Sequence, residues 1–178
     1  MIRSYLLFLF TLLTASASLD AQNLQSAVGA RLGYPVSLSY KTFLGESDDA
    51  LEFTLGTRGR NFRTYSYRWI TASGAYLKHK DLSLKGIDDM DGLQWYYGFG
   101  AAAYFWSYKD NDPFFDFDDS ASSVSFGVQG YIGIAYTLKE MPVNLTLDWV
   151  PTVFVNGFDS GFGLGYGSLG VRYVINER

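Results

Sequence analysis

The sequence predicts an all-β fold, an eight-stranded antiparallel transmembrane β-barrel whose strands follow one another as an up-and-down meander. Three observations lead to it. Several segments alternate between apolar and other residues with the two-residue period of a β-strand. Beyond the N-terminal segment, no run of about 18 apolar residues is present to form a spanning helix. Charged residues make up only 18% of the chain, below the ~25% of typical soluble domains, and aromatic residues make up another 18%.

The composition fits one ordered domain and excludes several classes of function. The 178 residues are 48% hydrophobic, and 14 Lys and Arg against 18 Asp and Glu give a net charge of −4. Such a chain has no basic surface for nucleic acid, so no nucleic-acid partner is expected. One His and no Cys remove most metal-site and thiol chemistry. We therefore expect no cofactor and no metal.

The N-terminus has the pattern of a secretory signal peptide. Arg3 precedes a mostly apolar run, which ends at the small residues Ala15 to Ala17. The run is shorter than the ~20 apolar residues that a spanning helix requires. We therefore predict a signal peptide over residues 1–21, with cleavage after Ala17 or after Ala21, and a barrel over residues 22–178.

The alternation is clearest at residues 143–149. There Val143, Leu145, Leu147 and Trp149 share one face, and Asn144, Thr146 and Asp148 share the other. Together with the turn signals, similar patterns predict eight strands. They are at residues 26–33, 35–44, 50–59, 64–78, 92–107, 122–138, 143–155 and 162–175. The segment Gly33-Tyr34-Pro35 is tight enough to be either a loop or a bulge.

The connections favour an outer membrane. An even number of antiparallel strands returns both ends of the chain to the same side. If the mature N-terminus lies in the periplasm, the connection at residues 139–142 is a short periplasmic turn, and the long one at 109–123 faces outward. Short turns inside and long loops outside are typical of outer-membrane barrels. Connection four, residues 79–91, is long for a periplasmic turn, and we expect His79 there.

The second face of the strands indicates which side meets lipid. At residues 96–104 it consists of Tyr96, Gly98, Gly100, Ala102 and Tyr104. Small residues with a few polar ones suit the interior of a narrow barrel, so the apolar face is predicted to point outward. The alternative is a soluble periplasmic barrel with an apolar lumen that carries lipid. Aromatic residues toward the strand ends predict the two interfacial girdles. They are Trp69, Trp95, Tyr97, Phe105, Trp106, Tyr136, Trp149 and Tyr173.

The same parity predicts an interior polar network. Charges in so narrow a lumen are tolerated only when they pair or stay hydrated. We expect Asp148 to pair with Arg172 on the adjacent strand, and a lumen that is filled rather than conducting. A bulge near Gly167 is needed to reconcile the two parities of the last strand. The predicted network is Arg31, Lys41, Glu52, Arg58, Arg68, Asp148 and Arg172.

An acidic and aromatic loop is the candidate surface-interaction site. It contains Asp110, Asp112, Phe114, Phe115, Asp116, Phe117, Asp118 and Asp119. The residues lack the spacing of a calcium-binding loop. A solvated outer loop whose phenylalanines fold back onto the barrel rim is the simpler interpretation. No serine stands out as a partner for His79 in a hydrolase triad, so no catalytic residues are predicted.

Several segments resemble those of a known family. They are SYKTFL at 39–44, GLQWYYG at 92–98, residues 134–149, and the closing strand at 169–173. Over nearly the whole mature chain the sequence resembles the small eight-stranded outer-membrane barrels of the OmpA/OmpX type, and more closely a group of short, uncharacterised outer-membrane β-barrel proteins. Barrels of this type usually end in an aromatic residue, whereas here five residues follow Tyr173. The resemblance says little about activity.

These observations predict an integral outer-membrane protein with a filled polar interior and a structural or surface-interaction role. The alternative is a small-solute channel or a lipid-modifying enzyme built on the same barrel. We expect a monomer in contact with outer-membrane lipid and lipopolysaccharide. No sequence feature identifies a cognate ligand or a protein partner.

Overall fold

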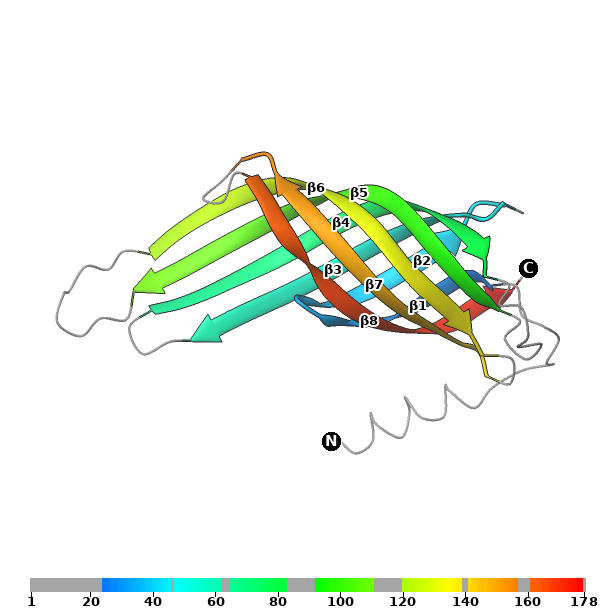
Figure 1. Ribbon diagram of the computed structural model, residues 1–178. Coiled ribbons are helices and arrows are strands. Elements are labelled where there is room, and N and C mark those ends of the chain that lie inside the picture. The colour runs from blue at the N-terminus through cyan, green and yellow to red at the C-terminus, as the bar shows by residue number, and fades with distance from the viewer. Residues whose placement is uncertain are drawn as a thin grey trace, which may run out of the picture.

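The computed structural model describes residues 24–45, 47–61, 65–82, 92–110, 120–138, 141–156 and 161–177. It confirms the all-β prediction, because these residues form eight strands that close into a barrel (Figure 1). The predicted signal peptide lies outside the described residues. The strands are β1 (Leu24–Gly33), β2 (Val36–Phe43), β3 (Asp49–Asn61), β4 (Tyr65–Asp81), β5 (Leu93–Asp110), β6 (Ser120–Thr137), β7 (Val143–Phe154) and β8 (Gly161–Glu177).

The strands form an antiparallel meander. Each strand pairs with the next, and β1 pairs with β8 to close the barrel. The register places Leu24 opposite Glu177, so the start of β1 and the end of β8 lie at the same end of the barrel. The turn between β1 and β2 consists of Tyr34 and Pro35 alone, which makes it a loop and not a bulge. Within the described part of the chain, no helix has the length and apolar character needed to cross a membrane.

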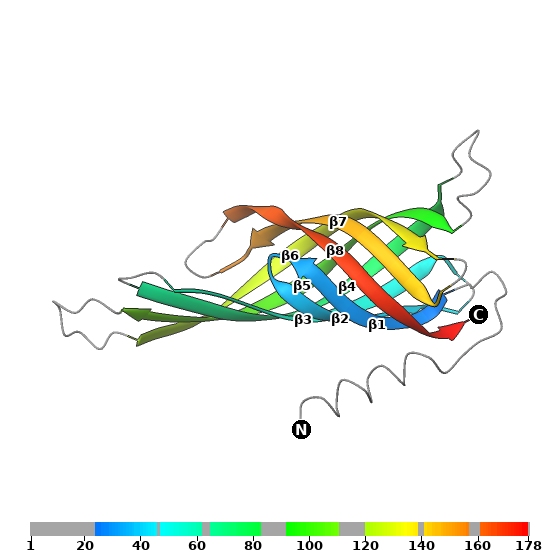
Figure 2. The same ribbon diagram turned by 90° about the horizontal axis from the view of Figure 1, so that it is seen from below.

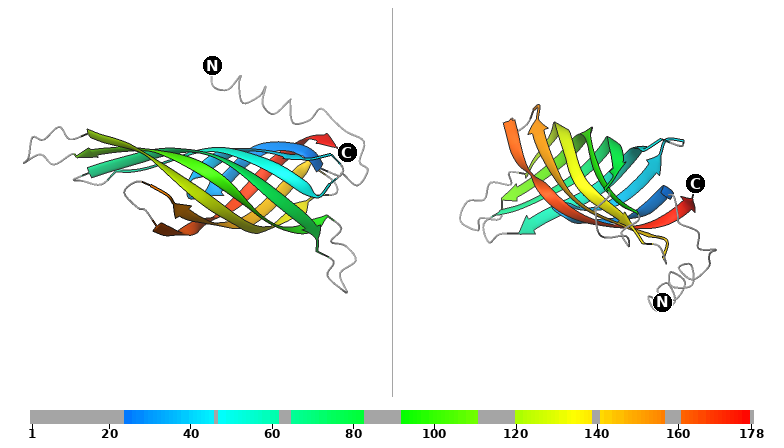
Figure 3. Two further views of the ribbon diagram at one scale, coloured as in Figure 1. Left: turned by 90° about the horizontal axis from the view of Figure 1, so that it is seen from above. Right: turned by 45° about the vertical axis from the view of Figure 1, so that its right-hand side comes forward.

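The barrel is taller on one side. β4, β5 and β6 have 17 to 18 residues, whereas β2 has eight. Because Val36 at the start of β2 pairs with Thr57, residues 58–61 of β3 continue past the β1–β2 turn. Figure 2 shows β3 to β6 projecting beyond β1 and β2, and both views of Figure 3 show the same tall side. We call the end of the barrel with this projection the open end. The opposite end, where β1 begins and β8 ends, is the terminal end.

The two faces of the strands have opposite character. On β2, Val36 and Leu38 are 54% and 66% exposed, whereas Ser39 and Lys41 are 2% and 1% exposed. Apolar side chains therefore point outward and polar ones point inward, the reverse of a soluble protein and the expected pattern of a membrane barrel. A lipid carrier with an apolar lumen would have the opposite arrangement.

β4 faces the other way from the prediction. Trp69 is buried in the barrel and the neighbouring Arg68 is exposed on the outer surface, so both predictions for this strand were wrong. Trp106 on β5 also lies on the inner side, in contact with Trp69. The middle of β4 explains the error, because Ile70 and Tyr76 on one face and Thr71 and Leu77 on the other give little contrast between apolar and polar positions.

β8 contains the predicted bulge, which is needed because the apolar residues of this strand change from even to odd positions. Val150 pairs with Tyr166, but Thr152 pairs with Gly163, so β8 has one extra residue between them. Gly165 lies there with φ of +75°, and a Cβ atom at this position would be 2.4 Å from the carbonyl oxygen of Val150. Only glycine fits such a conformation and contact. The bulge is two residues before the predicted position at Gly167.

Candidate functional site

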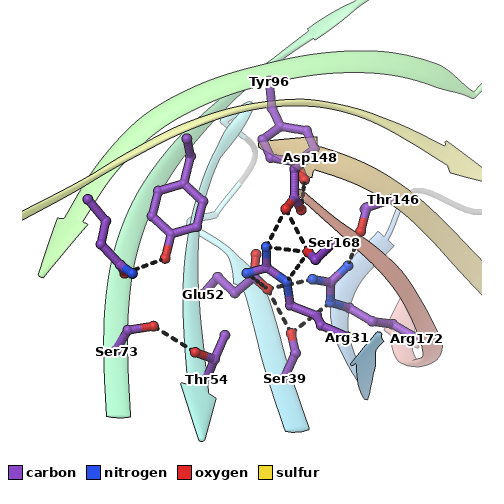
Figure 4. Close-up of polar contacts among 12 residues, drawn as sticks. Arg31, Ser39, Glu52, Thr54, Ser73, Tyr96, Thr146, Asp148, Ser168 and Arg172 are labelled. Carbon is purple, nitrogen blue, oxygen red and sulfur yellow. Dashed lines mark hydrogen bonds and ion pairs between the residues drawn. The ribbon is translucent and has the colours of Figure 1, made fainter. Parts of the chain in front are cut away.

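Four charged side chains meet in the middle of the lumen (Figure 4). They are Arg31 on β1, Glu52 on β3, Asp148 on β7 and Arg172 on β8, and we call them the charge cluster. Each is at most 5% exposed. Burying charges costs free energy unless they are paired and hydrogen-bonded, so the contacts of each member decide whether this arrangement is stable.

Arg31 is bound through both sides of its guanidinium group. Its Nη2 forms an ion pair with Oδ1 of Asp148, and Nη1 lies 3.4 Å from Oε1 of Glu52. Nε and Nη2 also donate hydrogen bonds to Oγ of Ser168, at 3.0 and 2.8 Å. The Ser168 hydroxyl donates in turn to Asp148 at 2.7 Å. Every polar atom of this arginine head group therefore has a partner.

Arg172 makes the corresponding set of contacts with Glu52. Its Nη2 forms an ion pair with Oε1 of Glu52, Nε donates to Oγ of Ser39 at 2.8 Å, and Nη1 donates to Oγ1 of Thr146 at 2.9 Å. Ser39 donates to Glu52 at 2.8 Å. The expected pair of Asp148 with Arg172 is thus replaced by three ion pairs, Arg31–Asp148, Arg31–Glu52 and Arg172–Glu52, each between strands that are not neighbours.

Interior glycines make room for these contacts. Tyr96 on β5 donates a hydrogen bond to Oδ2 of Asp148 on β7 at 2.6 Å, passing over Gly133 of the intervening β6. A Cβ atom on Gly133 would lie 2.8 Å from Cζ of Tyr96. On β8, a Cβ on Gly170 would lie 2.8 Å from Nη1 of Arg172. Side chains therefore reach across a strand where the residue between them has no side chain.

Further layers fill the lumen on both sides of the charge cluster. Tyr131 donates to the side-chain oxygen of Gln129 at 2.8 Å, and Gln129 donates to Tyr104 at 3.0 Å. Toward the terminal end, apolar side chains such as Leu77 and Val174 are 0% and 4% exposed. The described side chains consequently give the interior a packed core with a polar centre.

Lys41 is a third buried cation, and its ammonium group has no hydrogen-bond partner within the described chain. It lies 4.5 Å from the ring centroid of Tyr96, a distance at which the ring attracts a cation. Its neighbour in the register is Glu52, whose Oε2 also has no hydrogen-bond partner among the described residues. Lys41 thus stands beside the charge cluster without joining its hydrogen bonds.

His79 lies in β4 and not in a periplasmic turn, so that expectation was wrong. Its ring is 1% exposed and lies 4.9 Å from the ring centroids of both Phe43 and Tyr96. A general base must reach the proton that it removes. The position between two aromatic rings is that of a packed core residue.

Arg58 is on the inner face, but it belongs to an aromatic group near the open end. Its guanidinium group lies over the rings of Tyr34 and Trp69. Trp69 in turn lies 5.7 Å from Tyr67 and 4.5 Å from Trp106, between ring centroids. Sequence reasoning missed this group because aromatic residues near strand ends were assigned to the lipid interface. The nearby Arg58 was the available signal for an inward cation–π contact.

The other predicted girdle residues lie on the outward face. The outward set is Trp95, Tyr97, Phe105, Tyr136, Trp149 and Tyr173. Trp95 and Tyr97 stack at 5.3 Å near the terminal end of β5, and Nζ of Lys80 lies within 6.0 Å of both ring centroids. A ring pair beside a cation suits the boundary between hydrocarbon and water.

The acidic loop lies outside the described residues, except for the backbone of Asp110, which ends β5. Within the described chain, no group of three or more His, Asp or Glu residues is placed to hold a metal ion.

Comparison with known proteins identifies the fold. No protein-family model matches the sequence. No curated protein sequence matches it significantly. Among solved structures, the N-terminal β-barrel domain of Pseudomonas aeruginosa OprF matches with a TM-score of 0.56 and 16% identity, covering 86% of this chain and 98% of that domain.

Two further solved structures agree. Neisserial surface protein A (NspA) matches with a TM-score of 0.52 and 11% identity over 88% of this chain and 98% of its own. Ail, the attachment invasion locus protein of Yersinia pestis, matches with a TM-score of 0.54 and 11% identity over 85% of this chain and 99% of its own. The chain therefore has the fold of the small eight-stranded outer-membrane β-barrels, as its resemblance to the OmpA/OmpX type implied.

Proposed function

We propose that this protein is a monomeric integral protein of the outer membrane, with a filled lumen and a structural or surface-interaction role. The charge cluster is the observation that carries the proposal. Arg31, Glu52, Asp148 and Arg172 hold one another across the lumen and are nearly inaccessible to solvent. A barrel of eight strands has an interior just wide enough for such side chains to fill.

The orientation follows from the closed meander. Both described ends of the barrel wall lie at the terminal end, which we place in the periplasm. The open end, with the tall side formed by β3 to β6, then faces outward. In this orientation β5 ends and β6 begins on the exterior side, so the connection that carries the acidic and aromatic residues is where it can meet a partner.

A small-solute channel is the competing function, and the contacts of the cluster argue against it. A path through the lumen requires several of these ion pairs to separate. Leaving a buried charge without its partner typically costs about 3–5 kcal/mol, so such a path is unfavourable. Leu77 and Val174 are buried toward the terminal end, which also supports a filled lumen.

Planar-bilayer recording tests the proposal. The purified, refolded protein should give no stable single-channel steps, because ions find no continuous aqueous path. A variant that removes both arginine head groups, Arg31→Ala with Arg172→Ala, should increase the frequency of openings if it folds. Arg68→Ala removes the same charge from the outer surface and is the control, with no openings expected. Stable steps of uniform size from the unmodified protein would overturn the proposed role of the filled lumen.

A further inference from the structure

The outer surface of the barrel carries a groove that the lumen does not explain. It has a volume of about 1030 Å³ and is lined by residues of β1 to β5, most of them from β2, β3 and β4. Its apolar walls include Val36, Leu38, Leu55 and Ile70, which are between 48% and 66% exposed. Small residues also line it, namely Ala30, Gly59, Ser66 and Ser107. An apolar hollow of this size on a lipid-facing surface is suited to an acyl chain.

Arg68 lies at one end of the groove. The register places it between Gly59 on β3 and Ser107 on β5, whose small side chains leave its guanidinium group exposed. Arg68 makes no hydrogen bond or ion pair with the part of the chain that the structure describes. The hydroxyl groups of Ser66 and Ser107 line the same end and add two hydrogen-bond donors.

The position of Arg68 on β4 matches the boundary of a bilayer. The outward residues between Arg68 and Lys78 are Ile70, Ala72, Gly74 and Tyr76, none of them charged. Ten residues at ~3.3 Å each, tilted by ~40°, rise about 25 Å, which is the height of the apolar band in such barrels. Arg68 and Lys78 thus mark the two edges of the band. The groove runs from Arg68, at the open-end edge of the band, into the half of the hydrocarbon layer nearest the open end.

The local charge favours an anionic head group. From Phe53 to Lys80 the sequence contains no Asp or Glu, and Arg68 is among its basic residues and faces outward. Five Asp residues stand at the end of β5 and after it, at positions 110–119, outside the described residues except for the backbone of Asp110. On the outward face of the described β3, the one carboxylate is that of Asp49, which lies at the opposite edge of the band and pairs with Lys78 at 3.5 Å. An arginine that is free to present its planar fork binds phosphate through two parallel hydrogen bonds.

We propose that the groove binds one outer-leaflet lipid that carries a phosphate monoester. Its acyl chain lies along Leu38, Leu55 and Ile70, and Arg68 holds the phosphate with help from Ser66 and Ser107. The inference rests on the proposed location in the outer membrane, and it adds a specific lipid site to the interaction surface. It does not depend on whether the lumen conducts.

Native mass spectrometry of the refolded barrel ejected from nanodiscs tests the site. The nanodiscs contain phosphatidylcholine, whose phosphate is masked by choline, and a small fraction of diphosphorylated lipid A. We expect one lipid A molecule to stay bound to the unmodified protein. Arg68→Gln should reduce the bound fraction by about tenfold, the effect of losing a charge-assisted hydrogen bond. Lys80→Gln, the matched control, removes a cation from the outward face of the same strand at the opposite edge.

Two further comparisons separate the parts of the site. Ala30→Phe fills the groove while Arg68 stays in place, so it should also abolish retention if the acyl chain occupies the groove. The unmodified protein should retain dephosphorylated lipid A as weakly as Arg68→Gln retains the diphosphorylated form. Added inorganic phosphate should not displace lipid A from the unmodified protein. Each variant is first checked for a heat-dependent shift in gel mobility, which shows that it has folded.

Three outcomes would overturn the inference. Equal retention by the unmodified protein and Arg68→Gln removes the role of the arginine. Full retention of lipid A by Ala30→Phe excludes the groove as the site of the acyl chain. A loss of retention in Lys80→Gln equal to that in Arg68→Gln shows that binding follows overall charge alone. Conductance from the unmodified barrel, with selective retention of lipid A intact, would instead refute only the filled-lumen role.

Discussion

Arg31 on β1 and Asp148 on β7 form an ion pair although β8 runs between their strands. Ser168 of β8 lies between them, accepting a hydrogen bond from Arg31 at 2.8 Å and donating one to Asp148 at 2.7 Å. The contact therefore joins three successive strands at the seam where the last strand meets the first. Barrel closure is the step that leaves no unpaired strand edge in the membrane. The Arg31–Asp148 ion pair thus spans the seam at which the barrel closes.

Replacing Asp148 by Asn should strongly destabilise the barrel. The change leaves Arg31 buried without its full counter-charge, which typically costs 3–5 kcal/mol. Urea unfolding in lipid vesicles, followed by tryptophan fluorescence, measures the free energy of unfolding. Asp49→Asn is the matched control, because Asp49 pairs with Lys78 in a partly exposed ion pair and its loss should cost less than that of a fully buried pair. Equal effects of the two substitutions would contradict the structural role of the seam.

Gly133→Ala should destabilise the protein by about 1–3 kcal/mol, because the added methyl group overpacks the interior. Its Cβ would lie 2.7 Å from Cβ of Asp148 and 2.8 Å from Cζ of Tyr96. Gly74→Ala is the comparison, since its Cβ would meet only the ring of Phe53 at 3.5 Å, an ordinary contact. The same vesicle-based unfolding experiment compares the two. If Gly133→Ala is as stable as Gly74→Ala, the hydrogen bond from Tyr96 to Asp148 does not pass over Gly133.

Leu147→Arg should cost about 2–4 kcal/mol, because it places a charge on the lipid face near the middle of a strand. Leu147 is 55% exposed and lies five residues into the 12-residue β7. Val36→Arg, at the open-end edge of β2, should cost ~0–1 kcal/mol. Unfolding titrations of both variants in the same lipid give the difference. A Leu147→Arg protein of unchanged stability would show that β7 is turned the other way.

Trp69 and Trp149 should respond differently to lipid. Trp69 is 6% exposed on the inner side of β4, and Trp149 is 48% exposed on the outer side of β7. In single-tryptophan variants, acyl chains that carry bromine should quench the fluorescence of Trp149 strongly and that of Trp69 weakly. Strong quenching of Trp69 would restore the girdle position that its place near a strand end first suggested.

The fold was predictable because period-two alternation is strong on most strands. On β7, the contrast between Leu145 or Leu147 and Thr146 or Asp148 identifies both the strand and its faces. The contrast is weak on β4, where Thr71 and Ile70 are adjacent and where aromatic residues occupy the inner face at the open end. The predicted faces of Arg68 and Trp69 were consequently the reverse of the observed ones. Local pattern fixes a strand more reliably than it fixes the direction of a particular side chain.

The partners inside the lumen depend on information that no single strand contains. Asp148 and Arg172 are on adjacent strands, yet the stagger of the closed barrel brings Asp148 to Arg31 and Arg172 to Glu52. Stagger is set by the register of all eight pairs together. The interior glycines were visible in the sequence, but that Gly133 lets Tyr96 reach Asp148 follows only from the register.

Gel mobility of the outer-membrane fraction, with and without boiling, tests the central claim that this chain forms a closed barrel in the outer membrane. We expect the protein in that fraction, resistant to extraction by alkali, and with a different mobility before and after heating, because a closed barrel stays folded in detergent until it is heated. Recovery in the soluble periplasm, with the same mobility in both samples, would contradict it.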